Sequence, residues 1–363
     1  MYKKVLIVFT VIRKATLEKS LNYLVCPSDK ADLRLNIGNS DLISEGEFQC
    51  NECGRTYEIK DGVPYFFEKG NGSEWKDNLT DNTIIEDIAE TISDKDITWS
   101  KIIALSPLFL NNVKDRRKAI DKIFGIVGKI IRLCDVNSET EAYLTQAAIA
   151  ARYDIEVYKG TFKLPEEALS YLKNNYRKRQ GIIVEGACAT GDCLLELEET
   201  LDSRFYIGLD ISGTMVRKAQ QNIKENVLFV QGDVTSLPLK RNSAGIYVLN
   251  NLFDRVVDPP KTCEEADLIL RSAKQSFLVL SNCDPLQFGY TTEKGDKIIF
   301  VPENKQLTLE EGLEKAGFNR RVMEQGMWQI ETAAYGREAL PYKCLVGSRP
   351  TLDEFCLRNI GGI

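Results

Sequence analysis

Three acidic residues stand where three short apolar runs end, in the second half of the chain. Glu185 ends "GIIVE", Asp210 ends "FYIGLD" and Asp233 closes "VLFVQGD". Apolar runs of this length alternate with amphipathic segments, which predicts parallel strands whose carboxyl ends meet at one edge of a sheet. A carboxylate at that edge can accept the hydroxyls of a ribose or the amino group of an adenine. The pattern therefore predicts a nucleotide-type site built from strand ends.

The turn after the first of these strands, Gly186 to Gly191, reads "GACATG" and precedes a helix predicted from Asp192. Such a strand–turn–helix unit directs backbone N–H groups and a helix N-terminus at a ligand. Ala187 and Ala189 stand where a nucleotide-binding turn usually has glycine. Alanine costs little at these positions if φ stays negative, and its methyl group then only narrows the approach to the ligand. This narrowing favours a sulfonium nucleoside over a dinucleotide, whose pyrophosphate needs more room.

A second group of residues that could do chemistry lies near the N-terminus. Cys26, Asp29, Cys50 and Cys53 have the spacing of two metal-binding knuckles, with aspartate in place of one cysteine. Zinc accepts carboxylate as well as thiolate ligands, so this set could hold the metal. The chain has no histidine, and any metal site must therefore use Cys, Asp or Glu. Folding of this module without metal is the alternative, and both stay open here.

The composition limits the class of protein. The chain has 363 residues, of which 43% are apolar, and a net charge of −6, so more than one domain with a sizeable core is expected. An acidic chain has no overall field that attracts a polyanion, which disfavours nucleic acid and membrane as partners. The apolar run at the N-terminus is too short for a membrane span. Ten scattered cysteines do not resemble a secreted disulfide framework, so we expect a cytoplasmic protein.

The patterning divides the chain into four segments. We expect a zinc-ribbon-like β domain over residues 1–70, where short alternating runs are separated by turn signals, and a helical linker or lid over 71–160. Residues 161–350 alternate strands with helices, and 351–363 form a tail. The predicted fold class is α/β, a Rossmann-like doubly wound sheet with an antiparallel closing strand. The two long strands predicted in the last part of the third segment supply that closing hairpin.

The acid-ended segments resemble the class I S-adenosylmethionine-dependent methyltransferases, over about residues 161–350. That family has an acid-ended first strand with a G-x-G turn, an acid after the second strand and "GD…LP" after the third. The resemblance implies a methyltransferase whose cofactor is S-adenosyl-L-methionine. The cofactor-binding positions that it implies are Glu185, Gly186, Ala187, Ala189, Gly191, Asp210, Ile211, Asp233, Val234 and Asn250. The resemblance implies Asp210 as the ribose acid, Asp233 as the adenine acid, and Ile211 and Val234 as the residues on either side of the purine. A dinucleotide-binding domain is the alternative for this pocket, and the closing hairpin speaks against it.

The fourth predicted strand delivers Asn250 to the edge that faces the methyl group in this family. Methyl transfer is an in-line displacement, in which the enzyme holds the nucleophile and excludes water, and a strong base is optional. A carboxylate acceptor suits a chain without histidine, whereas an amine needs a residue to remove its proton. Asn250, Asp254 and Tyr290 are candidate catalytic residues, and each is also explained as an ordinary loop residue. The later "VDPP" is better explained as a helix start capped by Asp258 than as an amino-methyltransferase signature.

The cysteine module, about residues 21–67, resembles a small zinc-ribbon domain that also occurs as a separate activator subunit of transfer-RNA and translation-factor methyltransferases. The matching features are "CP-x-D-K" and "C-x-x-C-G-x-x-Y-x-I-x-D-G-V-P". The resemblance implies a zinc site at Cys26, Asp29, Cys50 and Cys53, although some members of this domain type fold without metal.

Three functions remain open from the sequence. The first is methylation of a peptide or small-molecule acceptor, at a carboxylate or an amine, because the chain is acidic and its extra N-terminal region is large. The second is RNA methylation, taken from the ribbon's relatives, for which "NNYRKRQ" is the only dense basic run. The third is a scaffold without catalysis. The sequence does not predict an oligomeric state.

Overall fold

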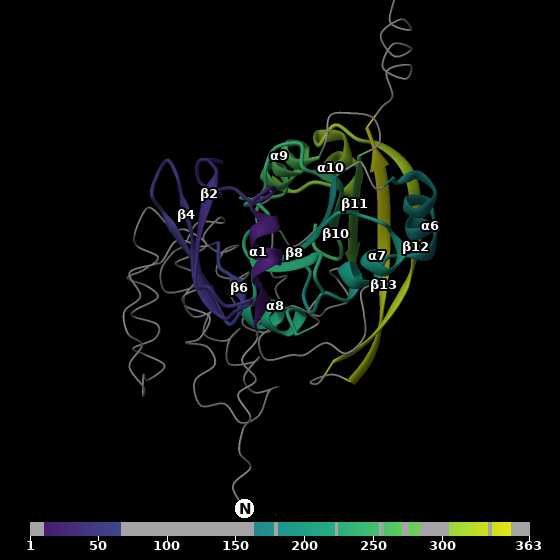
Figure 1. Cartoon of the computed structure of the whole chain (residues 1–363). Coiled ribbons are helices and arrows are strands. Elements are labelled where there is room, and N and C mark those ends of the chain that lie inside the picture. The colour runs from purple at the N-terminus through teal and green to yellow at the C-terminus, as the bar shows by residue number, and fades with distance from the viewer. Residues whose placement is uncertain are drawn as a thin grey trace, which may run out of the picture.

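The structure is a computed structural model of the whole chain, and its described residues form a mixed α/β body (Figure 1). The described residues are 11–66, 163–177, 181–221, 224–253, 256, 258–270, 276–283, 305–332 and 336–349. The predicted helical segment at 71–160 and the tail at 351–363 lie outside them, as do the candidate residues Asp254 and Tyr290. The predicted domain limits therefore stay a prediction.

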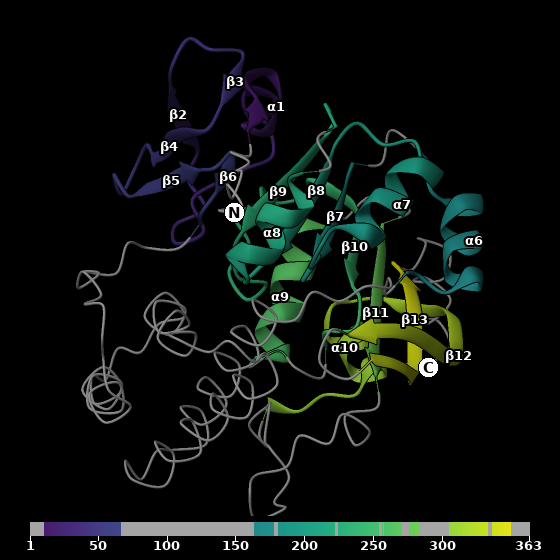
Figure 2. The same cartoon turned by 90° about the horizontal axis from the view of Figure 1, so that it is seen from below.

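Within the described residues, the main sheet has seven strands (Figures 1 and 2). Five run parallel in the order β11-β10-β7-β8-β9, and the antiparallel hairpin β12-β13 closes the sheet beside β11. Their bounds are Ile182–Gly186 (β7), Tyr206–Asp210 (β8), Val227–Gln231 (β9), Ala244–Leu249 (β10), Phe277–Cys283 (β11), Asn319–Thr332 (β12) and Gly336–Ser348 (β13). The predicted α/β fold with an antiparallel closing strand is confirmed.

Helices cover both faces of this sheet, as a parallel sheet of buried apolar strands requires. On one face, α6, α7 and α8 contribute Leu172, Leu197 and Val216 to the core, and on the other α9 and α10 contribute Ala266 and Leu313. The helix bounds are Glu166–Asn175 (α6), Asp192–Thr200 (α7), Gly213–Ala219 (α8), Pro259–Ile269 (α9) and Leu309–Lys315 (α10). None of the described helices has the length and apolar character needed to cross a membrane.

Two helices begin at caps that are visible in the sequence. The side chain of Asp258 accepts from the backbone N–H of Lys261 (3.0 Å) at the start of α9, which also has proline in its first turn. At α10, Thr308 and Glu311 form a reciprocal capping box. The interpretation of "VDPP" as a capped helix start is thus confirmed.

The N-terminal part is a small β-rich unit. A four-stranded antiparallel sheet has the order β2-β4-β5-β6, and β1 pairs with β3 beside helix α1. Phe48, Tyr57 and Phe66 stack at its centre. The bounds are Ile12–Arg13 (β1), Lys14–Ser20 (α1), Leu33–Ile37 (β2), Leu42–Ile43 (β3), Glu45–Cys50 (β4), Thr56–Lys60 (β5) and Val63–Pro64 (β6). The expected small β-rich ribbon is confirmed.

This ribbon lies against the β9 edge of the main sheet (Figure 2). Tyr65 forms a parallel bridge with Gln231 in β9, and the N–H of Phe66 donates to the carbonyl of the same residue (2.8 Å). Leu24 bridges to Leu239, and apolar residues of the ribbon share one core with the α9 face of the sheet. The edge strand is therefore covered by the same chain, which removes an open sheet edge.

Candidate functional site

The turn between β7 and α7 is held in left-handed backbone conformations. Ala187 has φ of 56°, Ala189 has φ of 46°, and Gly191, the residue before the helix, has φ of 81°. The condition under which alanine costs little, a negative φ, is therefore not met at either position. Left-handed φ costs a residue with a Cβ roughly 1–2 kcal/mol, which explains why glycine suits both positions better. The backbone shape of this turn therefore lowers the stability of the folded protein.

Asp210, at the end of β8, holds that turn in place. Its Oδ2 accepts from the backbone N–H of Ala189 (2.8 Å), and its Oδ1 accepts from the backbone N–H of Ser212 (2.8 Å). The side chain is buried, and Ser212 in turn caps α8 by accepting from the N–H of Met215. One carboxylate thus joins the turn after β7 to the turn after β8. The predicted ribose acid lies at the point where the two turns meet.

Glu185, one residue before the end of β7, points to the face that α7 covers. Its side chain is buried with 2% exposure, and burial raises its pKa to about 8, although hydrogen bonds from the Cys193 thiol and the Leu194 amide oppose the shift. Among the described residues its Oε2 has no hydrogen-bond partner. This carboxyl is mostly protonated at neutral pH, and a bound cation would favour its charged form.

Asp233 follows β9 on the same edge of the sheet. Its Oδ1 accepts from the backbone N–H of Thr235 (2.8 Å), and burial raises its pKa to about 6. The neighbouring Val234 lies close to the end of β7, because a Cβ added at Gly186 would come within 2.9 Å of its Cγ1. Val234 and Gly186, the first residue of the predicted cofactor turn, are therefore neighbours at this end of the sheet.

Ile211, the residue expected on the other side of the purine, is held through its backbone. The Gln231 side chain at the end of β9 donates to the carbonyl oxygen of Ile211 (2.7 Å). This bond connects the segment after β8 with the edge strand on which the ribbon is docked. The two segments expected to enclose a purine are thus fixed by the same strand.

Asn250 follows β10 and is fixed by a buried serine of β11. The Ser281 hydroxyl donates to Oδ1 of Asn250 (2.7 Å) and accepts from the backbone N–H of Asn251 (2.8 Å). Asn251 has a left-handed φ of 53°. A neutral carboxamide does not act as a base, and hydrogen bonding to Ser281 fixes the orientation of this one. The geometry therefore fits Asn250 as a residue that positions a ligand.

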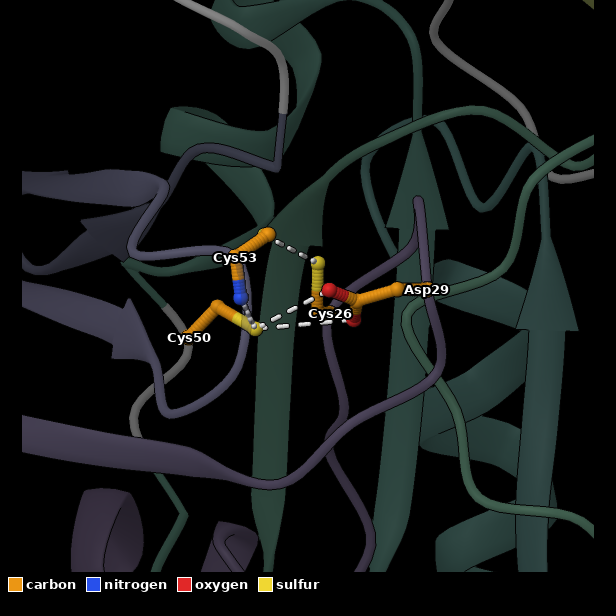
Figure 3. Close-up of side chains that lie close together, drawn as sticks. All are labelled: Cys26, Asp29, Cys50 and Cys53. Atoms are coloured by element: carbon orange, nitrogen blue, oxygen red, sulfur yellow. Dashed lines mark hydrogen bonds between the residues drawn. The ribbon is translucent and has the colours of Figure 1, made fainter.

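The cysteine module brings its four predicted ligands together (Figure 3). The ligand atoms of Cys26, Asp29, Cys50 and Cys53 all lie within 4.8 Å of one another. The Cys26 and Cys53 sulfurs are 3.8 Å apart, and the Cys50 sulfur lies 3.4 and 3.5 Å from the Asp29 oxygens. A tetrahedral zinc with bonds of about 2.0–2.3 Å has ligand–ligand distances of about 3.3–3.8 Å. The donor set and its spacing therefore fit zinc.

Backbone donors support this cluster from outside. The N–H of Ala31 donates to Oδ1 of Asp29 (3.0 Å), and the N–H of Cys53 donates to the sulfur of Cys50 (3.4 Å). The hydrogen bond between Asp29 and Cys53 holds the pKa of the carboxyl well below its usual range and raises the pKa of the thiol to about 12. A metal ion would have to displace the proton of Cys53.

Two family models match the chain, one on each of these sites. Residues 177–322 match a model described as a methyltransferase domain, and residues 18–62 match a model described as Trm112p-like protein. The chain carries a methyltransferase domain behind a Trm112-like domain. The four cysteine-module ligands fall inside the Trm112-like match, and the predicted cofactor positions from 185 to 250 fall inside the methyltransferase match.

Three of the solved structures that are similar to part of this chain are as follows. A chain of the complex between the Haloferax volcanii Trm112 methyltransferase activator and a methyltransferase has 17% identity and a TM-score of 0.39, covering 51% of this chain and 88% of its own. A methyltransferase from Bacillus halodurans has 13% identity, a TM-score of 0.39, and coverage of 51% and 100%. A methyltransferase from Methanosarcina mazei has 16% identity, a TM-score of 0.38, and coverage of 52% and 98%. Among curated proteins, no relative matches the sequence.

Sequence reasoning missed two features, one inside the methyltransferase domain and one between it and the ribbon. Ser281 lies inside the buried strand "SFLVLSN", and a hydroxyl among apolar residues was the available signal for its role. The second is the ion pair between Lys30 and Glu265, which joins residues 235 positions apart. The motif "CP-x-D-K" contains this lysine, but nothing in the sequence pairs it with a glutamate on a distant helix.

Proposed function

We propose that the protein transfers a methyl group from S-adenosylmethionine, which binds across the carboxyl ends of β7, β8 and β9. The observation that carries the proposal is Asp210 holding the left-handed turn through the Ala189 amide, with Glu185 in β7 and Asp233 after β9 at the carboxyl ends of the same sheet, inside the residues that match the methyltransferase domain. The turn places backbone N–H groups and the start of α7 at the same edge. No single acid would carry this proposal; the arrangement of all three supports it.

Each acid has a role that its surroundings support. Asp210 lies between the turns after β7 and β8 and binds a backbone N–H of each, which is the place proposed for the ribose hydroxyls. Asp233 would accept a hydrogen bond from the amino group of the adenine, beside Val234. Glu185 lies behind the turn, where its carboxyl group can face the ammonium group of the methionine part. A cation there would favour the ionised form of a carboxyl whose pKa burial has raised.

The chemistry needs little from the protein beyond position. S-adenosylmethionine supplies a methyl group on a sulfonium, and the C–S electron pair stays on sulfur as the acceptor's lone pair forms the new bond. Asn250, fixed by Ser281, lies after β10 and would orient the acceptor or the cofactor through its amide N–H groups. Asp254 and Tyr290 remain proposed candidates for removing a proton when the acceptor is an amine.

The Trm112-like domain would act within the same chain. The ribbon pairs with strand β9, which places it next to the segments that follow β8 and β9. The ribbon would therefore lie beside the proposed cofactor site. Zinc on Cys26, Asp29, Cys50 and Cys53 would hold the two knuckles together, a structural role rather than a catalytic one. We also infer a reducing, cytoplasmic setting, which suits the seven free cysteines found among the described side chains.

We propose a peptide or small-molecule acceptor, methylated on a carboxylate or an amine, because the chain is acidic and lacks histidine. The test is incubation of the zinc-loaded protein with labelled S-adenosylmethionine and a cell extract, followed by separation into peptide, RNA and small-molecule fractions. Label in the peptide or small-molecule fraction supports the proposal. Label in the RNA fraction would show that the acceptor is RNA and not a peptide or small molecule. If the label did not exceed that of an Asp210→Ala control, the scaffold alternative would be favoured.

A further inference from the structure

A strip of hydrogen bonds joins the ribbon to the segment that follows Asp233. The N–H of Val25 donates to the carbonyl of Pro238 (3.0 Å), and the N–H of Lys240 donates to the carbonyl of Tyr23 (2.8 Å). The Ser236 hydroxyl donates to the carbonyl of Pro27 (3.2 Å). We call residues 236–240 the clamped segment, because its backbone is fastened to the ribbon at several successive positions.

One ion pair lies at the centre of this strip. The Lys30 ammonium donates to Oε2 of Glu265 (2.8 Å) and to the carbonyl oxygen of Leu237 (2.8 Å). The same Oε2 accepts from the backbone N–H of Leu237 (2.9 Å). Both backbone groups of Leu237 are therefore bound by this pair, one by each partner. Leu237 lies four residues after the proposed adenine acid, Asp233.

The surroundings make this pair stronger than an ordinary surface contact. The Glu265 side chain is only 5% exposed, and the Lys30 side chain is 32% exposed. A carboxylate buried to this degree needs its partner, because an unpaired buried charge is strongly destabilising. Its negative charge also acts on Asp233, where it adds to the burial that raises the pKa of that acid. Loss of Lys30 would therefore be transmitted to the adenine side of the site.

The cysteine knuckle sets the direction of Lys30. Its φ is 60°, a left-handed conformation, and it follows the metal-ligand candidate Asp29 directly. The knuckle is closed by the N–H of Lys30 donating to the carbonyl of Cys26 (2.8 Å) and the N–H of Cys26 donating to the carbonyl of Ala31 (2.9 Å). A left-handed lysine persists only where its surroundings enforce it. The closed knuckle thus aims the ammonium at Glu265.

We propose that Lys30 and Glu265 are positioning residues for the cofactor. They fix the clamped segment, so that closure of the ribbon's first knuckle sets the affinity of the methyltransferase domain for its nucleoside. This inference rests on the proposed function, since it assigns a cause to cofactor affinity at the same site. Neither residue touches the reacting atoms.

The test compares two lysines whose ion pairs each join the ribbon to the methyltransferase domain, Lys30 with Glu265 and Lys240 with Asp32. Lys30→Met removes the buried pair, whereas Lys240→Met removes an ion pair to Asp32, whose side chain is 68% exposed. We expect Lys30→Met to raise the dissociation constant of S-adenosylhomocysteine at least tenfold, with the zinc content unchanged. Lys240→Met should change it less than twofold. Equal, small effects of the two substitutions would overturn the proposal, as would loss of zinc from Lys30→Met.

A double variant separates positioning from simple loss of folding. In Lys30→Met with Glu265→Gln no unpaired charge remains, so the double variant should recover most of the affinity that the single variant loses. Hydrogen exchange should be faster over residues 233–239 in Lys30→Met than in Lys240→Met. If the wild type binds no nucleoside, the proposed function fails. The exchange comparison still shows whether the pair fixes this segment, and equal exchange in the two variants would reject that.

Discussion

The cysteine cluster and the proposed cofactor turn are two parts of the molecule that the same chain builds in opposite ways. In the cluster, four side chains converge from two knuckles, and their ligand atoms lie within 4.8 Å of one another. The turn is built mainly by the backbone. Two alanines have left-handed conformations, and the buried Asp210 accepts a hydrogen bond from the backbone N–H of Ala189. The first site depends on side-chain chemistry, and the second on backbone shape.

This difference affects how each site responds to change. A side-chain site should fail when one ligand is removed, because the remaining ligands no longer complete the coordination of a metal. A backbone site should tolerate substitutions that relax its conformation, and it should fail when the carboxylate that holds it is lost. Four substitutions or conditions test this contrast below, from the largest expected effect to the smallest.

The largest effect should come from breaking the metal set. Cys50→Ser should lose the one zinc ion expected per chain. The free energy of unfolding of the ribbon should fall by several kcal/mol, because a structural zinc contributes directly to folding. Metal content and denaturant unfolding of the purified protein measure both. Cys344→Ser, a buried cysteine of β13 far from the cluster in sequence, should keep its zinc. The zinc assignment would be contradicted if the purified wild type contained no zinc and if a chelator did not change its unfolding.

The next effect concerns Glu185 and pH. Its folded-state pKa of about 8 lies above the ordinary value of 4.5, so its contribution to stability is fully present below pH 4.5 and is lost as the pH rises towards 8. At about 1.4 kcal/mol per pH unit, the wild type should lose about 3 kcal/mol between pH 5 and 7.5 that Glu185→Gln does not lose. Urea unfolding at both pH values measures this. The exposed Glu199→Gln should follow the wild type, and parallel pH profiles for all three proteins would contradict the burial of this carboxyl.

A smaller effect should appear in cofactor affinity at acidic pH. The pKa of Asp233 is raised to about 6. The hydrogen bond that we propose from the adenine amino group to Asp233 needs the ionised carboxylate. The dissociation constant of S-adenosylhomocysteine should therefore rise up to tenfold per pH unit as the pH falls below 6. Calorimetry at pH 5 and 7 measures the change. In Asp233→Asn the affinity should be lower and nearly independent of pH, and a wild type with the same flat profile would remove Asp233 from the site.

The smallest effect should come from relaxing the turn. Ala189→Gly removes the strain of left-handed φ, about 1–2 kcal/mol, and adds roughly 0.5–1 kcal/mol of entropic cost, for a net gain of about 0.5–1 kcal/mol. Denaturant unfolding should show this gain. Ala168→Gly, in helix α6, should lose stability instead, because helical φ already suits alanine there. A loss for both variants would mean that Ala189 is not strained.

Much of this molecule could be predicted from its sequence, and the limits have physical causes. Alternating apolar runs gave the parallel sheet and its closing hairpin, because side-chain period and burial are local properties of the chain. The cysteine set was identifiable because its ligands stand at fixed offsets within two short turns. The sign of φ at Ala187 and Ala189 was not, since it is imposed by the carboxylate of Asp210 and by the start of α7.

The contact between Lys30 and Glu265 lies beyond sequence reasoning for a different reason. Each residue looks like an ordinary member of its segment, one in a knuckle and one on an amphipathic helix. Their pairing depends on how the ribbon docks on the edge of β9, which follows from long-range packing. Patterns within a segment cannot specify which faces of two distant segments meet.

The most direct test of the account is a titration of the wild type, Asp210→Ala and Glu199→Ala with S-adenosylhomocysteine. Asp210 both secures the turn through the Ala189 amide and is the proposed partner of the ribose. We predict that the wild type and the exposed-site control Glu199→Ala bind alike, and that Asp210→Ala binds at least 100-fold more weakly. Equal binding by Asp210→Ala, or no binding by the zinc-loaded wild type, would contradict the central claim that this sheet edge is the cofactor site.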